Sequence, residues 1–130
     1  MIKDVSDLEV YQEALRLLPE IYSLSRRLAK SEYDLVLQVR RAGKSIAANI
    51  AEGFAKRSSE KEFKRFLKIA IGSSDEVITH LRMIAIVQPN LSFEAKRLAD
   101  KYKVLSKRIN SLCSHWQSGG TFRSSDTQTV

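Results

Sequence analysis

Apolar residues recur in steps of four and three along most of this chain, and that spacing constrains the fold more than any other feature. The longest run of this pattern is Phe63, Leu67, Ala70, Ser74, Val77, Leu81 and Ile84. Residues spaced in this way share one face of an α-helix, and the alternating steps favour packing at a shallow angle against neighbouring helices. The chain has only 5 Gly and 2 Pro, too few for the many turns of an all-β fold. An all-α fold is therefore expected.

Three further segments repeat the pattern. The first has Leu8, Tyr11, Leu15, Leu18 and Tyr22, flanked by Leu17, Ile21, Leu24 and Leu28. The second has Leu35, Val39, Ala42, Ile46, Ile50 and Phe54, and the last has Leu98, Tyr102, Leu105, Ile109, Leu112 and Trp116. Four amphipathic helices with short connections predict an antiparallel up-down four-helix bundle over residues 1–116. The polar residues 117–130, rich in Gly, Ser and Thr, predict a disordered tail.

Capping and turn residues predict where these helices begin and end. Ser6–Glu9 and Ser59–Glu62 have the spacing of capping boxes, and Ser92 is a candidate cap for the last helix. Pro89 cannot continue a helix, so the third helix should end before it. The segment 29–34 is the expected first connection.

Composition indicates the cellular compartment in which the protein is expected. No stretch approaches the 18 apolar residues of a membrane span, and the first ten residues carry acids where a signal peptide needs basic residues. The single cysteine, Cys113, cannot form an internal disulfide, which suits the cytosol. A cytoplasmic protein that does not enter a membrane is expected.

The positive charge is concentrated in the middle of the chain. The net charge is +7, and residues 38–68 hold nine Lys or Arg against three Glu. The nine are Arg40, Arg41, Lys44, Lys56, Arg57, Lys61, Lys64, Arg65 and Lys68. No aromatic residues interleave with them in a way that suggests base stacking, so contact with nucleic-acid phosphates is the form of binding expected. The alternative is an ordinary solvated face.

A polar stripe accompanies the apolar stripe of the second helix. Ser45, Asn49, Glu52 and Lys56 share one side of that helix. We expect Ser45, Asn49 and Glu52 to be buried or half-buried in a structural network with Ser73 or with the turn after Gly53. Ligand contact through Asn49 is the alternative.

Small residues form a ridge on the same helix, at Gly43, Ala47 and Ala51. The ridge permits a close approach of the third helix within one chain, or of a second subunit.

The sequence contains no group of reactive residues with the spacing that catalysis requires. His80 and His115 lack metal-ligand spacing, and Cys113 and His115 point to different sides of one helix. No phosphate-binding loop or zinc-protease motif occurs. A protein with no enzymatic activity, no cofactor and no metal is expected.

The segment "LQVRRAGKSIAANIAEGFAKRSSEKEFKRFLKIAIGSSDEV" resembles the bacterial four-helix bundle proteins, also called 23S rRNA intervening-sequence proteins. The matching residues are Arg40, Arg41, Ser45, Ile46, Asn49, Ile50, Ala51, Glu52 and Gly53, followed by Glu62, Phe63, Phe66, Leu67, Ile69, Ala70, Gly72, Ser73 and Glu76. Ala47 departs from the pattern, since many relatives have proline there.

The resemblance implies an up-down bundle that assembles as a ring of five subunits. Some members of that family are encoded in inserts within ribosomal RNA genes, and distant relatives are accessory subunits of reverse transcriptases in diversity-generating retroelements. The function expected is a non-enzymatic, oligomeric module that binds RNA or a nucleoprotein. The alternative is a scaffold that binds another protein and touches no nucleic acid.

Overall fold

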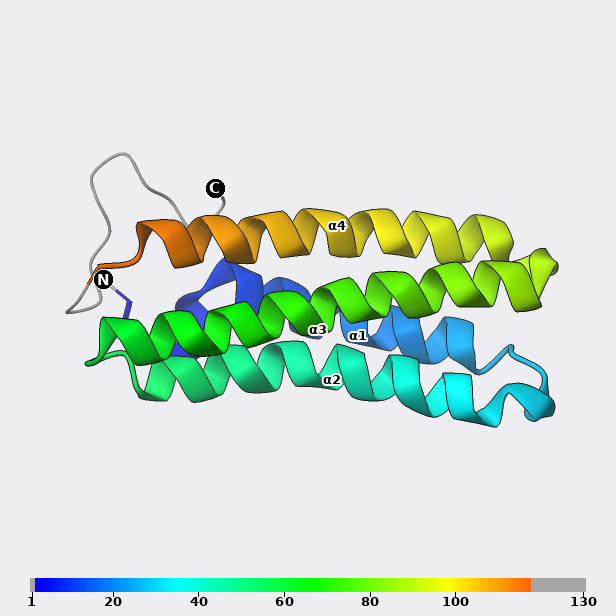
Figure 1. Ribbon diagram of the computed structural model, residues 1–130, viewed down its shortest axis with the longest axis horizontal. Coiled ribbons are helices and arrows are strands. Elements are labelled where there is room, and N and C mark those ends of the chain that lie inside the picture. The colour runs from blue at the N-terminus through cyan, green and yellow to red at the C-terminus, as the bar shows by residue number, and fades with distance from the viewer. Residues whose placement is uncertain (1, 118–130) are drawn as a thin grey trace.

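Four long antiparallel helices make up the part of the protein that the structure describes (Figure 1). The computed structural model describes residues 2–117. The helices are α1 (Glu9–Ser25), α2 (Tyr33–Ala55), α3 (Glu60–Val87) and α4 (Ser92–His115). Single 3-10 turns precede three of them: η1 (Val5–Asp7), η2 (Lys30–Glu32) and η3 (Pro89–Leu91). The predicted all-α four-helix bundle is confirmed.

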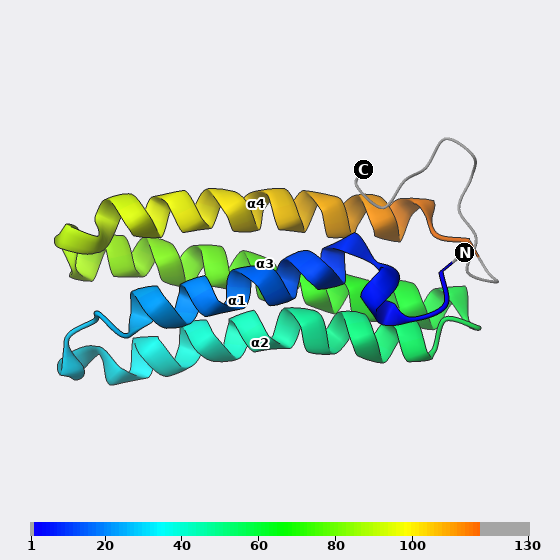
Figure 2. The ribbon, with the colours of Figure 1, turned by 180° about the vertical axis from the view of Figure 1, so that it is seen from behind.

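Each helix packs against two neighbours around a shared core. α3 has the most extensive contacts, with α2 on one side and α4 on the other, whereas α1 and α4 touch only sparsely. The view from behind shows α1 lying across the seam between α2 and α4 (Figure 2). The connections α1–α2 and α3–α4 lie at one end of the bundle, and the α2–α3 connection lies at the other (Figure 1).

The predicted core faces of α2, α3 and α4 are correct. Every residue of the three stripes within 35–54, 63–84 and 98–116 is buried. The stripe ends at Trp116, whose ring meets Phe63 edge-on with 4.6 Å between ring centroids. Trp116 thereby closes the core next to the α2–α3 connection. The disordered tail predicted for 117–130 lies, apart from Gln117, outside the described residues.

The predicted core face of α1 is wrong. Leu15 is 44% exposed and Tyr11 is only half-buried, while the flanking residues form the core. Those buried flanking residues include Leu17, Ile21 and Leu24. Apolar residues cover more than one side of this helix, so spacing alone leaves two rotations open, and packing against α2 selects one of them.

Two helix ends also differ from the predictions. The first capping box is made by Asp4 and Asp7 around η1, and α1 then begins at Glu9 without a side-chain cap. Ser92 is the first residue of α4, and Leu91 holds the cap position. Ser59 caps α3 as predicted, because its hydroxyl accepts the Glu62 N–H at 3.2 Å. The Glu62 carboxylate pairs with Arg65, so the second half of the predicted capping box is not seen. No helix within residues 2–117 has the length and hydropathy needed to cross a membrane.

Candidate nucleic-acid interface

The α2–α3 connection brings two helix ends unusually close together. Gly53 is buried in the last turn of α2, and a Cβ built on it would lie 2.7 Å from the Phe66 Cβ and 3.2 Å from the Phe63 carbonyl oxygen. Only glycine fits this contact without displacing α3. The short segment between the helices is then closed by the Ser59 cap, which starts α3 at Glu60.

Six of the nine candidate basic residues gather around this connection. They are Lys56, Arg57, Lys61, Lys64, Arg65 and Lys68, and we call the surface they form the basic end. All six side chains are exposed or half-buried. The four on α3 recur at steps of three and four, so they share the outer side of that helix.

Local carboxylates neutralise three of these residues. Lys56 pairs with Glu52 at 3.4 Å, and Lys64 pairs with Glu60 at 3.5 Å. Arg65 forms two hydrogen bonds with Glu62, at 3.1 and 3.3 Å. Within residues 2–117, Lys61 and Lys68 have neither an ion pair nor a hydrogen bond. These two ammonium groups therefore have the most charge to offer a polyanion.

The other three candidate basic residues, Arg40, Arg41 and Lys44, do not belong to the basic end. At 1.5 Å per residue, Arg41 lies about 22 Å along α2 from Lys56. Arg40 points towards α1, where its guanidinium lies 4.4 Å from the Tyr22 ring centroid and its Nε donates to the Ser25 hydroxyl at 2.9 Å. Arg40 is thus a packing residue between helices. Arg41 and Lys44 are exposed near the middle of the bundle.

Aromatic rings do accompany the charges at the basic end, which corrects a second expectation. The Arg65 guanidinium carbon lies 4.4 Å from the centroid of the Phe66 ring, and the Lys56 ammonium lies 5.0 Å from it. The Arg57 guanidinium lies 4.0 Å from the Phe54 ring centroid and donates to the Phe54 carbonyl oxygen. Helical spacing did not indicate these contacts. The Lys56–Phe66 contact crosses the α2–α3 connection, and the Arg65–Phe66 contact joins adjacent residues, which do not normally face each other on a helix.

The polar stripe of α2 is partly as expected. Asn49 Nδ2 donates to the Ser45 carbonyl oxygen at 2.8 Å and to the Ser45 hydroxyl at 2.9 Å. The Ser45 hydroxyl in turn meets the Ser73 hydroxyl of α3 at 2.8 Å. Asn49 therefore reaches Ser73 only through Ser45.

Glu52 does not join this network, so its assignment there is wrong. Its side chain is exposed and pairs with Lys56. Glu52 lies about two turns beyond Ser45 on α2. It is next to Gly53, where no space is left between the helices, and its side chain turns outward to solvent.

The small-residue ridge lies against α1 at Gly43. A Cβ on Gly43 would lie 2.6 Å from Ile21 Cδ1, so this part of the ridge faces α1 and not α3. The neighbouring Ala47 is buried as well.

The remaining reactive groups are placed as packing residues. His80 is buried with its Nε2 3.1 Å from Glu76, and its Nδ1 has no partner in the described chain. Burial raises the pKa of the Cys113 thiol, although Lys68 and Lys64 act in the opposite direction. Three His, Cys, Asp or Glu residues close enough to hold a metal ion do not occur within residues 2–117.

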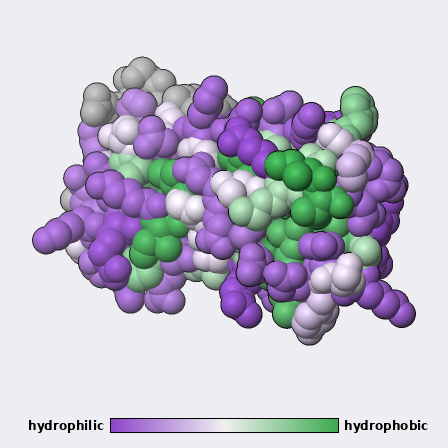
Figure 3. All heavy atoms as spheres, turned by 45° about the vertical axis from the view of Figure 1, so that its right-hand side comes forward, coloured by the Kyte–Doolittle hydropathy of each residue, from purple (hydrophilic) through white to green (hydrophobic). Residues whose placement is uncertain are grey.

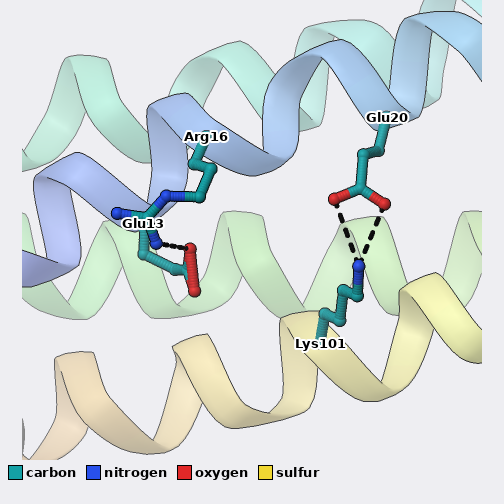
Figure 4. A network of polar contacts seen from close by, with 4 residues as sticks. All are labelled: Glu13, Arg16, Glu20 and Lys101. Carbon is teal, nitrogen blue, oxygen red and sulfur yellow. Dashed lines mark hydrogen bonds and ion pairs between the residues drawn. The ribbon is translucent and has the colours of Figure 1, made fainter.

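Sequence reasoning missed the polar seam between α1 and α4. Lys101 of α4 reaches Glu20 of α1 at 3.1 Å, next to an intrahelical pair of Glu13 and Arg16 (Figure 4). A second pair, Arg27 with Glu94, lies closer to the α3–α4 end. A groove of about 440 Å³ opens between them. The paired residues are 67 and 81 positions apart, so no local spacing could have signalled them.

The chain is thus a four-helix bundle protein with basic residues gathered at its α2–α3 end. It belongs to the 23S rRNA-intervening sequence protein family, whose model matches residues 6–111. The resemblance carried by residues 37–77 is confirmed by this match. A comparison with curated proteins found no match.

Proposed function

We propose that the protein is a non-enzymatic, cytoplasmic RNA-binding module whose basic end contacts phosphates. One observation carries this proposal: Lys61 and Lys68 stand on the outer side of α3 without an acidic partner in the described chain. Lys56 and Lys64 add two further ammonium groups, held only by ion pairs of 3.4 and 3.5 Å. Exposed pairs of this kind contribute little, so a phosphate can displace the carboxylate.

Membership of a family named for ribosomal RNA supports RNA as the nucleic acid. Binding through lysines to phosphates would be salt-dependent and nearly independent of sequence. Neither a metal nor a cofactor is needed for this role. A reverse transcriptase or another RNA-handling protein is the partner class that would use such a module, with the bundle holding RNA beside it.

A mobility-shift assay with mixed-sequence RNA at low and at about 150 mM salt tests the proposal. We expect binding that weakens steeply as salt rises. An excess of an uncharged polymer of similar size should not compete, whereas a sulfated polysaccharide should. Failure to bind RNA even at low salt would contradict the proposal.

We also propose that the protein works as an oligomer, with the ring of five that the family resemblance implies. Large apolar side chains remain exposed at the end opposite the basic end, and Figure 3 shows green apolar atoms gathered over that part of the surface. They are Tyr33, Leu37, Met83, Ile86, Val87 and Phe93, which we call the apolar end. Exposed apolar clusters of this kind are typical of protein interfaces.

The second candidate function, a scaffold for another protein, is favoured by the same apolar end. If that surface binds a partner protein instead of a second copy, the purified chain would be monomeric. The scaffold alternative also predicts no RNA binding, so the two assays together separate it from the leading proposal.

A further inference from the structure

Arg65 is held in a fixed orientation near the start of α3, at the basic end. Its Nε and one terminal nitrogen donate to the two carboxylate oxygens of Glu62, at 3.1 and 3.3 Å. Its guanidinium also lies against Phe66, 4.4 Å from the ring centroid. Two hydrogen bonds on one edge and the phenyl ring beneath the central carbon leave the guanidinium little freedom to turn.

The pairing with Glu62 makes Arg65 a poor ligand for phosphate, because much of its charge is already neutralised and two of its donors are used. Its planar guanidinium group can still contact a ligand through a face. The side chain is 53% exposed, so part of the guanidinium surface is accessible to a ligand. Guanidinium planes and aromatic rings are the surfaces on which proteins stack unpaired bases.

Lys61 and Lys68 flank this plane. They lie four residues before and three residues after Arg65, which places all three on neighbouring turns of the same helix side. Both ammonium groups are exposed and, within residues 2–117, unpaired. A nucleotide with its base on Arg65 would therefore have a lysine available on either side for the adjoining phosphates.

We propose that Arg65, backed by Phe66, is a stacking platform for one unpaired nucleobase of an RNA strand whose phosphates contact Lys61 and Lys68. The inference rests on the proposed RNA-binding function and adds a ligand class to it: single-stranded RNA in preference to duplex. Bases inside a duplex are stacked on each other and cannot reach the platform. Every base has a π face, so little sequence preference is expected.

The test compares two short strands with equal numbers of phosphates, one a mixed-sequence single-stranded RNA and one an abasic ribose-phosphate oligomer. Fluorescence anisotropy gives the ratio of their affinities. Stacking of one base predicts that the RNA binds about 5- to 150-fold more tightly than the abasic strand. Arg65→Lys keeps the charge but removes the plane, so it should bring this ratio close to one.

Lys61→Gln is the matched control. It should weaken binding of both strands by the same factor and leave their ratio at the wild-type value. Helicity measured by circular dichroism checks that both variants fold.

Three results would overturn the inference. Equal affinity of the wild-type protein for the two strands would contradict the stacking platform but not the proposed binding of phosphates. An unchanged ratio in Arg65→Lys would place any stacking elsewhere. Binding of neither strand at low salt would remove the proposed RNA function itself, and this inference with it.

Discussion

Asn49 contributes to stability through hydrogen bonds that its position on α2 makes possible. Its amide donates to the carbonyl oxygen and the hydroxyl of Ser45, and the hydroxyl continues to Ser73 on α3. Because Asn49 is half-buried and Ser45 keeps Ser73 as a partner, the loss of these bonds should cost about 1 kcal/mol. The chain offers a matched site in Asn110, which is exposed on α4.

We predict that Asn49→Ala lowers the free energy of unfolding by about 1 kcal/mol relative to Asn110→Ala, as measured by urea denaturation. Both substitutions gain the same helix propensity from Ala, so the difference isolates the hydrogen bonds. Equal effects at the two sites would mean that the Ser45–Asn49–Ser73 network does not stabilise the fold.

Tyr102 presents the opposite case, a buried polar group that is not satisfied. Its ring is fully buried and its hydroxyl has no hydrogen-bond partner among the described residues. A stranded hydroxyl loses its bonds to water without replacement. Tyr102→Phe should therefore leave the free energy of unfolding unchanged or raise it by up to about 1 kcal/mol at neutral pH. Tyr33→Phe, at an exposed site, is the control, and a clear loss in Tyr102→Phe alone would reveal a hidden partner for the hydroxyl.

The same phenol makes stability depend on alkaline pH. Burial raises the pKa of Tyr102, and the nearby carboxylates of Glu20 and Glu13 add to the shift. An unfolded tyrosine ionises at about pH 10, whereas the folded Tyr102 stays protonated at that pH. The free energy of unfolding therefore has its full value below about pH 10 and falls as the pH rises above it. Tyr102→Phe removes this loss. Its advantage over the wild type should grow by about 1.4 kcal/mol between neutral pH and about pH 11. A constant difference across this range would show that the folded and unfolded phenols ionise alike.

Among the elements, α2 and α3 depend on two glycines in different ways. Gly53 permits the contact between the helices, since an added Cβ would lie 2.7 Å from the Phe66 Cβ and 3.0 Å from the Phe63 ring. Gly72 sits on the exposed side of α3 with no atom within 4 Å of such a Cβ. The same substitution should therefore have opposite effects at the two positions.

We predict that Gly53→Ala lowers the free energy of unfolding by about 1–3 kcal/mol through overpacking. Gly72→Ala should raise it by about 0.5–1 kcal/mol, because Ala restricts the unfolded chain and favours the helix. Thermal denaturation followed by circular dichroism measures both. A stabilising Gly53→Ala would show that the α2–α3 contact has room to relax.

The elements also show how far the sequence could be interpreted. The core faces of α2, α3 and α4 followed from spacing because each has one apolar side, whereas α1 has two and its rotation depends on packing. Ser59 was predictable as a cap because the signal is local, and the Lys101–Glu20 pair was not because it joins two distant segments. The placement of Arg40 against Tyr22 likewise required the relative rotation of two helices. Within the candidate site, the basic residues could be read from the sequence, but their ion pairs could not. The sequence therefore did not show that Lys64 is paired with Glu60 while Lys61 has no ion pair in the described chain.

At the scale of the whole molecule, the two ends of the bundle differ in chemistry. The basic end carries exposed Lys and Arg side chains, whereas at the apolar end Ile86 and Phe93 are each 77% exposed. Leu17, Ile21, Leu24 and Ile78 also widen the apolar sides of their helices, but all four are buried within the chain and are not available to a second subunit. The apolar end is the interface that we propose.

We therefore predict that light scattering gives a mass several times the 14.8 kDa of one chain at micromolar concentration. Ile86→Glu combined with Phe93→Glu should reduce that mass and leave helicity unchanged, because a buried interface excludes unpaired carboxylates. Thr79→Glu together with Ser31→Glu, two exposed polar sites, controls for added negative charge. A monomeric wild-type chain would contradict the oligomer.

The central claim is that the basic end binds RNA phosphates. The slope of the logarithm of the affinity for single-stranded RNA against the logarithm of salt concentration tests it most directly. Engagement of four phosphates by Lys56, Lys61, Lys64 and Lys68 predicts a slope of about −3, at about 0.7 per phosphate. The double variant Lys61→Gln with Lys68→Gln should bring the slope to about −1.4, since two contacts are lost.

The matched double variant Lys96→Gln with Lys107→Gln removes two exposed charges from α4 that have no ion pair in the described chain. Lys101 and Lys103 on the same helix are unsuitable as controls, because they are paired with Glu20 and Asp100. This variant should retain the wild-type slope of about −3. If both double variants reduce the slope equally, net charge alone drives binding, and the claim of a binding surface at the basic end is wrong.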